Sequence, residues 1–241
     1  MIILLSLWLL LVPTLSLAKP NSPQIINLLL VADHAHGENY PTIRETFESY
    51  STNFYTWNIT TTGLYEKIHY CSFQPLFDLT PDILLQNITD ITKFDCLSIL
   101  PGRYHEGLRS NATALKLIRD AVSKGLIVTA WCRAVGVLAK ADIIWGKNIT
   151  GHAKFESEYL AAGAIYTPDS PPIRDGNIIT SGRAWDYLNE TCELIASACY
   201  EKLGIDTNIT TNTSVPAWIS ATGLLACIVI TITLSRTSRK R

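Results

Sequence analysis

The sequence predicts an α/β protein in which helices cover both faces of a mostly parallel sheet, followed by a C-terminal transmembrane helix. Continuous apolar runs at 25–32 and 93–100 are typical of strands buried on both faces. They alternate with segments such as 112–124, whose apolar residues recur at helical spacing. This alternation predicts βαβ units and therefore a parallel sheet. The uncharged segment 215–235 is long enough to cross a bilayer and predicts the transmembrane helix.

The first strand, 25–32, is followed by the polar loop 33–39. Pro41 then stands in the first turn of a predicted helix, where its missing N–H group is not needed. Residues 54–59 alternate between polar and apolar side chains, which predicts a second strand. The buried strand 93–100 comes next and completes the first half of the sheet.

The helix 112–124 begins the second half of the domain, with Asn111 or Ser110 as its N-cap. The β-branched run that follows predicts a buried strand at 127–131. The small residues of 134–139 then predict the start of another helix.

The remaining elements are shorter, apart from the last helix. Residues 143–150 predict a turn and a short strand, and 154–162 predict a helix. The turn Asp175-Gly176 precedes a strand at 177–180. A helix at 185–203 ends the domain.

Both ends of the chain carry membrane signals. Residues 1–18 are almost wholly apolar and end in a small-x-small pattern, which is typical of a cleaved signal peptide; an uncleaved anchor is the alternative. The Thr/Asn-rich residues 206–214 indicate a stalk before the span 215–235, for which a buried core helix is the alternative. The basic tail 236–241 predicts that the domain 24–205 lies outside the cytosol. We therefore expect a single-pass membrane protein with an extracytoplasmic N-terminal domain.

Asn-x-Ser/Thr sequons favour the same location, because N-glycans are found on proteins that have left the cytosol. The sequons predicted to carry glycan are Asn58, Asn87, Asn111, Asn189, Asn208 and Asn212. Asn148 also lies in a sequon, but its place beside the expected site predicts that it is unmodified.

The chain has six cysteines and a net charge of −1. With Cys227 inside the predicted span, an odd number remains, so at least one thiol is expected to be free. Cys192 and Cys199 lie two turns apart on one predicted helix, which is too far for a disulfide. His34 and His36 lack a third metal ligand and are expected in a solvent-exposed loop. No motif predicts a metal, a cofactor or a nucleic-acid partner.

Cys132 is the strongest candidate for a catalytic residue. It stands between the strand 127–131 and the next helix, where α/β proteins present a nucleophile. A helix N-terminus lowers the pKa of a thiol, and the neighbouring guanidinium of Arg133 favours the thiolate. The alternative is a buried structural thiol, because free cysteine is among the most buried residue types.

Five segments of the chain occur in a characteristic order. They are the first strand with its acidic loop and Pro41, Leu100-Pro-Gly-Arg103, the strand–Cys132–helix unit, Asn148-Ile-Thr-Gly-His152, and Asp175-Gly-Asn-Ile-Ile-Thr-Ser181. This order resembles the ThiJ/PfpI family over about 24–204. The resemblance implies a flavodoxin-like, doubly wound sandwich related to class I glutamine amidotransferases, and a domain that can form homo-oligomers.

The resemblance also implies roles for individual residues. Cys132 matches the family's nucleophile, Glu38 the acid that positions the thiol, and His152 a histidine that moves the proton. The backbone N–H groups implied to hold an oxyanion are those near Gly102, Arg103 and Arg133.

The chain also departs from the family's pattern. Glu106 resembles the acid that protease-like members lend across a subunit interface, but in isolation it is more typical of a surface charge. Arg133 stands where some members have histidine, and Arg103 replaces the second glycine of a Pro-Gly-Gly turn. Trp131, before the nucleophile, is bulkier than usual.

Three functions are weighed on this basis. The first is a membrane-tethered enzyme whose nucleophilic cysteine acts on small carbonyl compounds, as glyoxalases and deglycases do, or on amide or peptide bonds. The alternative is a non-catalytic redox-sensing or ligand-binding ectodomain of the same fold. A third is a purely structural surface glycoprotein.

Overall fold

The computed structural model of the protein describes residues 23–71, 77–103 and 105–205. The chain divides into two compact units, Met1–Cys199 and Tyr200–Arg241. Among the described residues, no helix is both long and apolar enough to cross a bilayer. The predicted leader 1–18, stalk 206–214 and span 215–235 lie outside the described residues.

The first unit is built on a seven-stranded sheet in the order β10-β11-β7-β6-β1-β3-β5. Every neighbouring pair is parallel except β10 and β11, which form an antiparallel hairpin. The strands are β1 (Gln24–Ala32), β3 (Tyr55–Gly63), β5 (Ile83–Leu84), β6 (Cys96–Ile99), β7 (Ile127–Trp131), β10 (Ile173–Asp175) and β11 (Ile178–Ser181). Counted along the chain, β1, β3, β6, β7 and β11 lie in the spatial order 2-1-3-4-5, a common doubly wound order. The predicted mostly parallel α/β sheet is confirmed.

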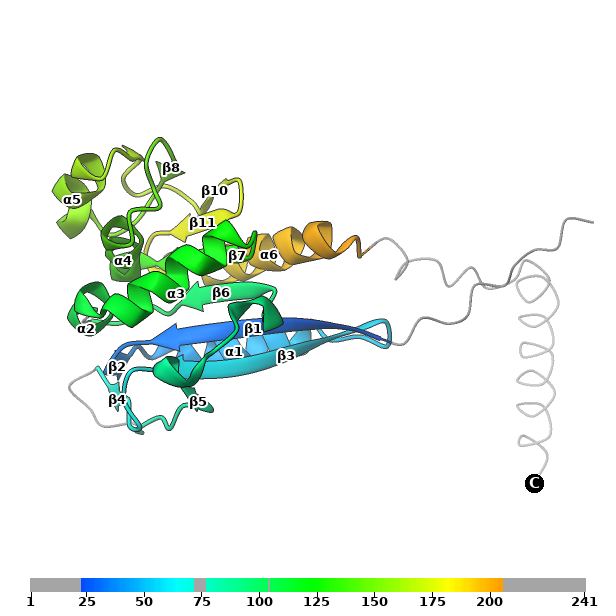
Figure 1. Ribbon diagram of the computed structural model, residues 1–241. Helices are drawn as coiled ribbons and strands as arrows, with labels where there is room; N and C mark the ends of the chain where they lie inside the picture. The colour runs from blue at the N-terminus through cyan, green and yellow to red at the C-terminus, as the bar shows by residue number, and fades with distance from the viewer. Residues whose placement is uncertain (1–22, 72–76, 104, 206–241) are drawn as a thin grey trace, which may run out of the picture. The chain divides into compact units, whose positions relative to one another are not determined.

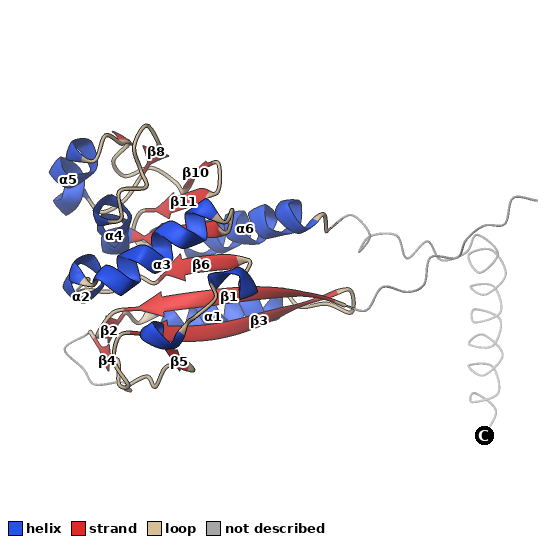
Figure 2. Cartoon of the chain, viewed as in Figure 1, coloured by secondary structure: helices blue, strands red, loops and turns tan. Residues whose placement is uncertain are grey.

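Helices lie on both faces of this sheet. Figure 2 shows α3 in front of the sheet and α1 and α6 behind it. The helices are α1 (Asn39–Ser49), α2 (Glu106–Ser110), α3 (Ala112–Ser123), α4 (Val135–Lys140), α5 (Glu156–Ala161) and α6 (Ala184–Leu203). Short 3₁₀ turns occupy Leu85–Asn87, Ile91–Lys93, Cys132–Ala134 and Ala153–Phe155.

The two-sided cover explains why β1 is an unbroken apolar run. Leu29 and Val31 belong to the core that includes Ile118 of α3. Leu28 and Leu30 point to the opposite face, because side chains alternate along a strand, and they are equally buried. Both faces of β1 therefore need apolar side chains, as the sequence predicted.

The short strand predicted within 143–150 is present as β8 (Asn148–Ile149), which pairs with β9 (Ile165–Tyr166). The sequence missed β9, and it missed β2 (Ala35–His36) and β4 (His69–Tyr70), which pair with each other. Two residues are too few to show a periodicity, so β2, β4 and β9 had no detectable signal. At α3 the choice between two caps is settled, since the Asn111 side chain accepts a hydrogen bond from the backbone N–H of Ala114 at 2.9 Å.

Trp131, the last residue of β7, is fully buried beneath the turn that carries Cys132. Its indole Nε1 donates to the hydroxyl of Ser98 on β6 at 2.9 Å. The Ser98 hydroxyl also accepts a hydrogen bond from Thr129 at 2.6 Å. This buried network ties the ends of two central strands together.

His105 lies in the loop between β6 and α2 and is 3% exposed. Its Nε2 lies 3.0 Å from the carbonyl oxygen of Leu100, and its Nδ1 has no hydrogen-bond partner within the described part of the chain. Burial lowers the pKa of His105, because the charged imidazolium would lose its hydration there.

We expect the free energy of unfolding to fall as the pH drops below about 6.5, the ordinary pKa of histidine. The unfolded chain binds a proton that the buried His105 excludes, so stability is complete above that pH and is lost as the pH falls. Urea unfolding of the full-length chain at a series of pH values measures this slope. The variant His105→Gln, which keeps an N–H donor for Leu100 and cannot titrate, should show a shallower slope; an unchanged slope would assign the effect to other groups.

Candidate active site

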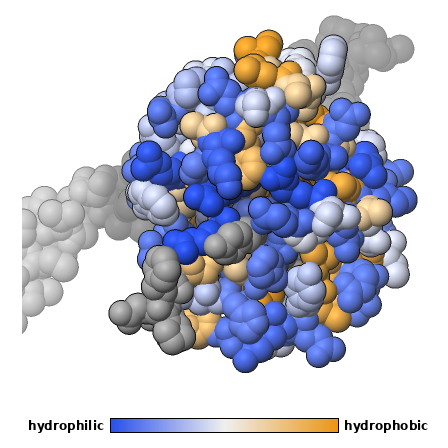
Figure 3. Space-filling view, turned by 90° about the vertical axis from the view of Figure 1, so that its left-hand side faces the viewer, coloured by the Kyte–Doolittle hydropathy of each residue, from blue (hydrophilic) through white to orange (hydrophobic). Residues whose placement is uncertain are grey.

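A cavity of about 380 Å³ opens at the carboxyl edge of the sheet. The loops after β1, β6, β7 and β11 meet there, because the carboxyl ends of parallel strands share one edge. In doubly wound sheets, ligands bind at this edge where the strand order reverses, and that reversal falls between β1 and β6. Figure 3 views the molecule from the side toward which these strands point and shows a largely hydrophilic surface.

The predicted catalytic residues converge on this cavity. Those lining it are Glu38, Gly102, Arg103, Cys132, Arg133 and His152. They come from four separate segments of the chain. The sequence shows only the order of these segments, whereas the structure shows that they line one cavity. The cavity is the candidate active site.

Cys132 occupies a sharp turn between β7 and the 3₁₀ turn that leads into α4. Its φ is +53°, a left-handed conformation that costs a non-glycine residue about 1–3 kcal/mol. Such strained strand-to-helix turns present nucleophiles in other α/β enzymes. The side chain is 8% exposed. The backbone carbonyl oxygen of Cys132 accepts a hydrogen bond from the backbone N–H of His152 at 3.2 Å, which fixes the His152 loop beside the turn.

Burial raises the pKa of the Cys132 thiol above its ordinary value. A hydrogen bond from the Arg133 backbone and the positive charges of Arg133 and Arg183 act in the opposite direction without cancelling this effect. The expected lowering of this pKa is therefore wrong, although Arg133 acts in the expected direction. The sulfur carries its proton at neutral pH, and a base must remove that proton during the reaction.

His152 is poorly suited to be that base. Its Nδ1 accepts a hydrogen bond from the backbone N–H of Lys154 at 3.1 Å, which caps the following 3₁₀ turn. The neutral ring therefore carries its proton on Nε2 and can only donate from that atom. Burial, followed by the charges of Arg133 and Arg183, lowers the pKa of His152 and keeps it neutral. Its Nε2–H suits a hydrogen bond to a developing oxyanion.

Glu38 is the one carboxylate among the residues that line the cavity. The side chain is exposed, and the hydroxyl of Tyr70 donates to its Oε2 at 3.3 Å. In the described part of the chain, this carboxylate has no hydrogen bond with Cys132. Glu38 is therefore the candidate proton acceptor among the lining residues.

Two glycines let the loops after β1 and β6 approach closely. A Cβ atom on Gly102 would lie 3.0 Å from the carbonyl oxygen of Ala35, and one on Gly37 would lie 3.2 Å from that of Pro101. The Arg133 guanidinium donates to the carbonyl oxygen of Arg103 at 3.2 Å. The turn with the unusual Arg103 is thus tied to the residue next to the nucleophile.

Glu106 lies outside the cavity and is exposed at the start of α2, as expected of a surface charge, and it accepts a hydrogen bond from the backbone N–H of His105 at 3.0 Å. Another residue differs from the sequence-based expectation. His36 was expected to be solvent-exposed but is fully buried against the rings of Tyr40, Tyr70 and Phe77. The short strand β2 turns its side chain inward, and nothing in the local sequence indicated that turn.

Three further lining residues could not be predicted from the sequence, namely Cys71, Arg183 and Trp185. They lie in loops or at a helix start, where no periodicity marks them. The described cysteines, Cys71 among them, are all free thiols. Across the described residues, no group of three or more metal-ligating side chains is suitably placed for a metal ion.

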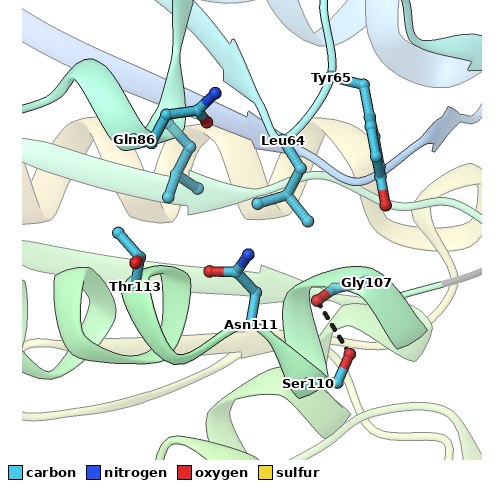
Figure 4. A pocket seen from close by; sticks show the side chains of 8 residues that line it. Leu64, Tyr65, Gln86, Gly107, Ser110, Asn111 and Thr113 are labelled. Atoms are coloured by element: carbon cyan, nitrogen blue, oxygen red, sulfur yellow. Dashed lines mark hydrogen bonds between the residues drawn. The ribbon is translucent and has the colours of Figure 1, made fainter.

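A second cavity, of about 360 Å³, lies between α2, α3 and the loop after β3. Figure 4 shows Asn111 and Thr113 of one sequon among its lining residues, with Ser110 hydrogen-bonded to Gly107. The Asn111 oxygen is committed to capping α3. A glycan on the Asn111 nitrogen would therefore lie at this cavity.

The fold and the cavity define an α/β protein with a cysteine on a strand-to-helix turn. Residues 28–197 match the DJ-1/PfpI family, and the chain belongs to that family. The predicted family membership is confirmed.

Relatives and solved structures agree with this assignment. Protein DJ-1alpha of Drosophila melanogaster is 30% identical over 125 residues, which are 50% of this chain and 57% of that protein. Deglycase PfpI of Pyrococcus furiosus is 26% identical over 106 residues, 43% of this chain and 63% of that protein. The match thus spans less than two thirds of either relative. The crystal structure of Drosophila DJ-1beta has the same fold, with a TM-score of 0.57 at 22% identity over 76% of this chain and 99% of that one.

Proposed function

We propose that this chain is a cysteine-dependent enzyme acting on small carbonyl compounds, in the manner of a glyoxalase or deglycase, or on amide or peptide bonds. The observation that carries the proposal is the cavity in which Cys132, Glu38 and His152 meet at the carboxyl edge of the sheet. Relatives named deglycases support the same chemistry.

In the proposed reaction, these residues act in sequence. Glu38 takes the thiol proton as the Cys132 sulfur bonds to the carbonyl carbon, and the π electrons move to the oxygen. The Nε2–H of His152 and backbone N–H groups near Gly102 and Arg133 stabilise that oxygen. The proton on Glu38 is then available to the oxygen or to a leaving amine.

The proposal is tested by assaying the purified full-length chain against a 2-oxoaldehyde, a 2-oxo acid, a glycated amine, a simple amide and a peptide. Turnover of one of these that requires Cys132 supports the proposal. No turnover of any of them by a folded chain contradicts it.

The second candidate is a redox sensor, favoured by one observation: Cys71 lines the same cavity as Cys132. Peroxide oxidises the Cys132 thiol to a sulfenic acid and is itself reduced to water. Attack by the Cys71 thiolate then forms a disulfide and releases a second water.

Under this second function, we expect mild peroxide to remove two hydrogens from the chain and to link Cys71 to Cys132. Peptide mass spectrometry under non-reducing conditions detects the link. In Cys71→Ser, Cys132 should instead accumulate as sulfinic acid, because nothing traps the sulfenic acid. Oxidation of other thiols with Cys132 left intact contradicts the sensor.

We also propose that the domain is extracytoplasmic and tethered by 215–235. The apolar segments at both ends and the basic tail support this. Asn87 and Asn189 are exposed, whereas the side-chain nitrogens of Asn58 and Asn148 donate hydrogen bonds to Asn27 and Asp175. Resistance of the expressed chain to alkaline extraction from membranes, with a mobility shift on glycosidase treatment, tests the proposal; a fully extractable, glycan-free chain contradicts it.

A further inference from the structure

We propose that the Cys132 cavity selects an anionic carbonyl compound, one that carries a carboxylate next to the electrophilic carbon. This inference rests on the proposed function and specifies its substrate class. The neutral 2-oxoaldehydes, amides and peptides that the sequence alone favoured would be poorer ligands for this site.

The charge of the lining residues carries the inference. Three arginines, Arg103, Arg133 and Arg183, line the cavity together with one carboxylate, Glu38. Among the lining residues, positive charges thus outnumber negative ones, on a chain whose overall net charge is −1. Of the charged groups that act on Cys132, the guanidinium groups of Arg133 and Arg183 are opposed by the carboxylate of Asp186. A concave site lined by one sign of charge concentrates ligands of the opposite sign.

The positions of two of these arginines bring their charge to the nucleophile. The Arg133 guanidinium is fixed by its hydrogen bond to the carbonyl oxygen of Arg103, which neutralises no charge. Arg183 approaches Asp186 only at 3.9 Å, and Asp186 lies outside the cavity. An exposed pair at that distance is weak, so Arg183 can be used by a ligand.

The effect of these charges reaches the reacting atoms. Arg133 and Arg183 both disfavour protonation of His152, and both act against the burial that raises the Cys132 pKa. Two neighbouring groups that line the cavity thus experience the charge of the same two arginines. A carboxylate on the ligand would be attracted to these arginines beside the sulfur.

The covalent step needs no further reactant. The Cys132 sulfur forms a bond to the carbonyl carbon, the C=O π bond breaks, and the thiol proton reaches the new alkoxide by way of Glu38. The product is a neutral hemithioacetal centre beside an unchanged carboxylate. No group is oxidised or reduced.

Two alkylating reagents of nearly equal size test the charge preference without any turnover. Iodoacetate is an anion and iodoacetamide is neutral; with each, the Cys132 sulfur loses its proton and bonds to the methylene carbon as iodide departs into solvent. The quantity compared is the rate with iodoacetate divided by the rate with iodoacetamide at Cys132. We expect this ratio in the folded, full-length chain to exceed the ratio in the urea-unfolded chain by about tenfold at low salt. The excess should shrink as salt screens the arginines.

A matched pair of variants locates the effect. Arg183→Gln should reduce the excess about threefold, because it removes one of the positive charges around the cavity. Lys116→Gln removes the same charge from an exposed site on α3, paired with Asp120, and should leave the excess unchanged. Equal ratios in folded and unfolded chains, or equal effects of the two variants, overturn the inference.

Protection by carbonyl compounds gives an independent readout. Glyoxylate and methylglyoxal are both small aldehydes, but only glyoxylate carries a carboxylate. We expect glyoxylate to protect Cys132 from iodoacetamide at concentrations about tenfold lower than methylglyoxal requires. A chain that prefers the anions but turns over no carbonyl compound keeps this inference and loses the proposed enzyme; equal protection by both aldehydes overturns the inference alone.

Discussion

Replacing Cys132 with serine is expected to lower kcat/KM for a carbonyl or amide substrate by at least about 10³-fold. A hydroxyl is a far weaker nucleophile than a thiol, and the cavity holds no strong base to activate it. The thiol already carries its proton in this buried site, and in the proposed mechanism Glu38 removes it in the complex. A serine hydroxyl is much less acidic than a thiol, so the same carboxylate would deprotonate it far less readily. Initial rates on the best substrate from the screen measure the loss.

The control is the same chemical change at a distance. Cys199→Ser makes a thiol-to-hydroxyl exchange on α6, buried and outside the cavity, and should keep kcat/KM within a few-fold of wild type. Both variants must show a cooperative unfolding transition before the rates are compared. Substantial turnover by Cys132→Ser would mean that another residue carries the chemistry.

The position of the nucleophile could be predicted because its signal is local. The strand 127–131, the cysteine and the small residues after it are contiguous, and β7 has the predicted bounds. β1 could also be predicted, because a strand that is covered on both faces has apolar residues at successive positions. The order of the segments then placed Glu38, Gly102 and His152 near Cys132.

The chemical state of the site could not be predicted in the same way. The pKa of Cys132 depends on burial by segments distant in sequence, and this outweighs Arg133, the one charge the sequence placed beside it. The tautomer of His152 depends on a hydrogen bond from Lys154. Arg183 and Cys71 reach the cavity from loops, where neither spacing nor composition marks a residue as part of a site.

Trp131→Ala is expected to lower the free energy of unfolding by about 3–5 kcal/mol, the usual loss for a large aromatic side chain removed from a core. Trp131 is fully buried at the end of β7. Its loss leaves a void beneath the turn and removes the indole hydrogen bond to Ser98. Cys132 holds its left-handed backbone only because its surroundings impose it, so the same variant should also expose the thiol. Urea unfolding, together with the rate of Cys132 alkylation, measures both effects.

Two further variants separate packing from hydrogen bonding. Trp131→Phe keeps most of the buried ring and should cost about 1–2 kcal/mol, close to the loss of one hydrogen bond and a small void. Trp145→Ala removes the same side chain from a site that is 77% exposed and should cost less than about 1 kcal/mol. If Trp131→Ala destabilised the chain no more than Trp145→Ala, or left Cys132 as slow to alkylate as in wild type, the packing beneath the turn would not be what holds the nucleophile in place.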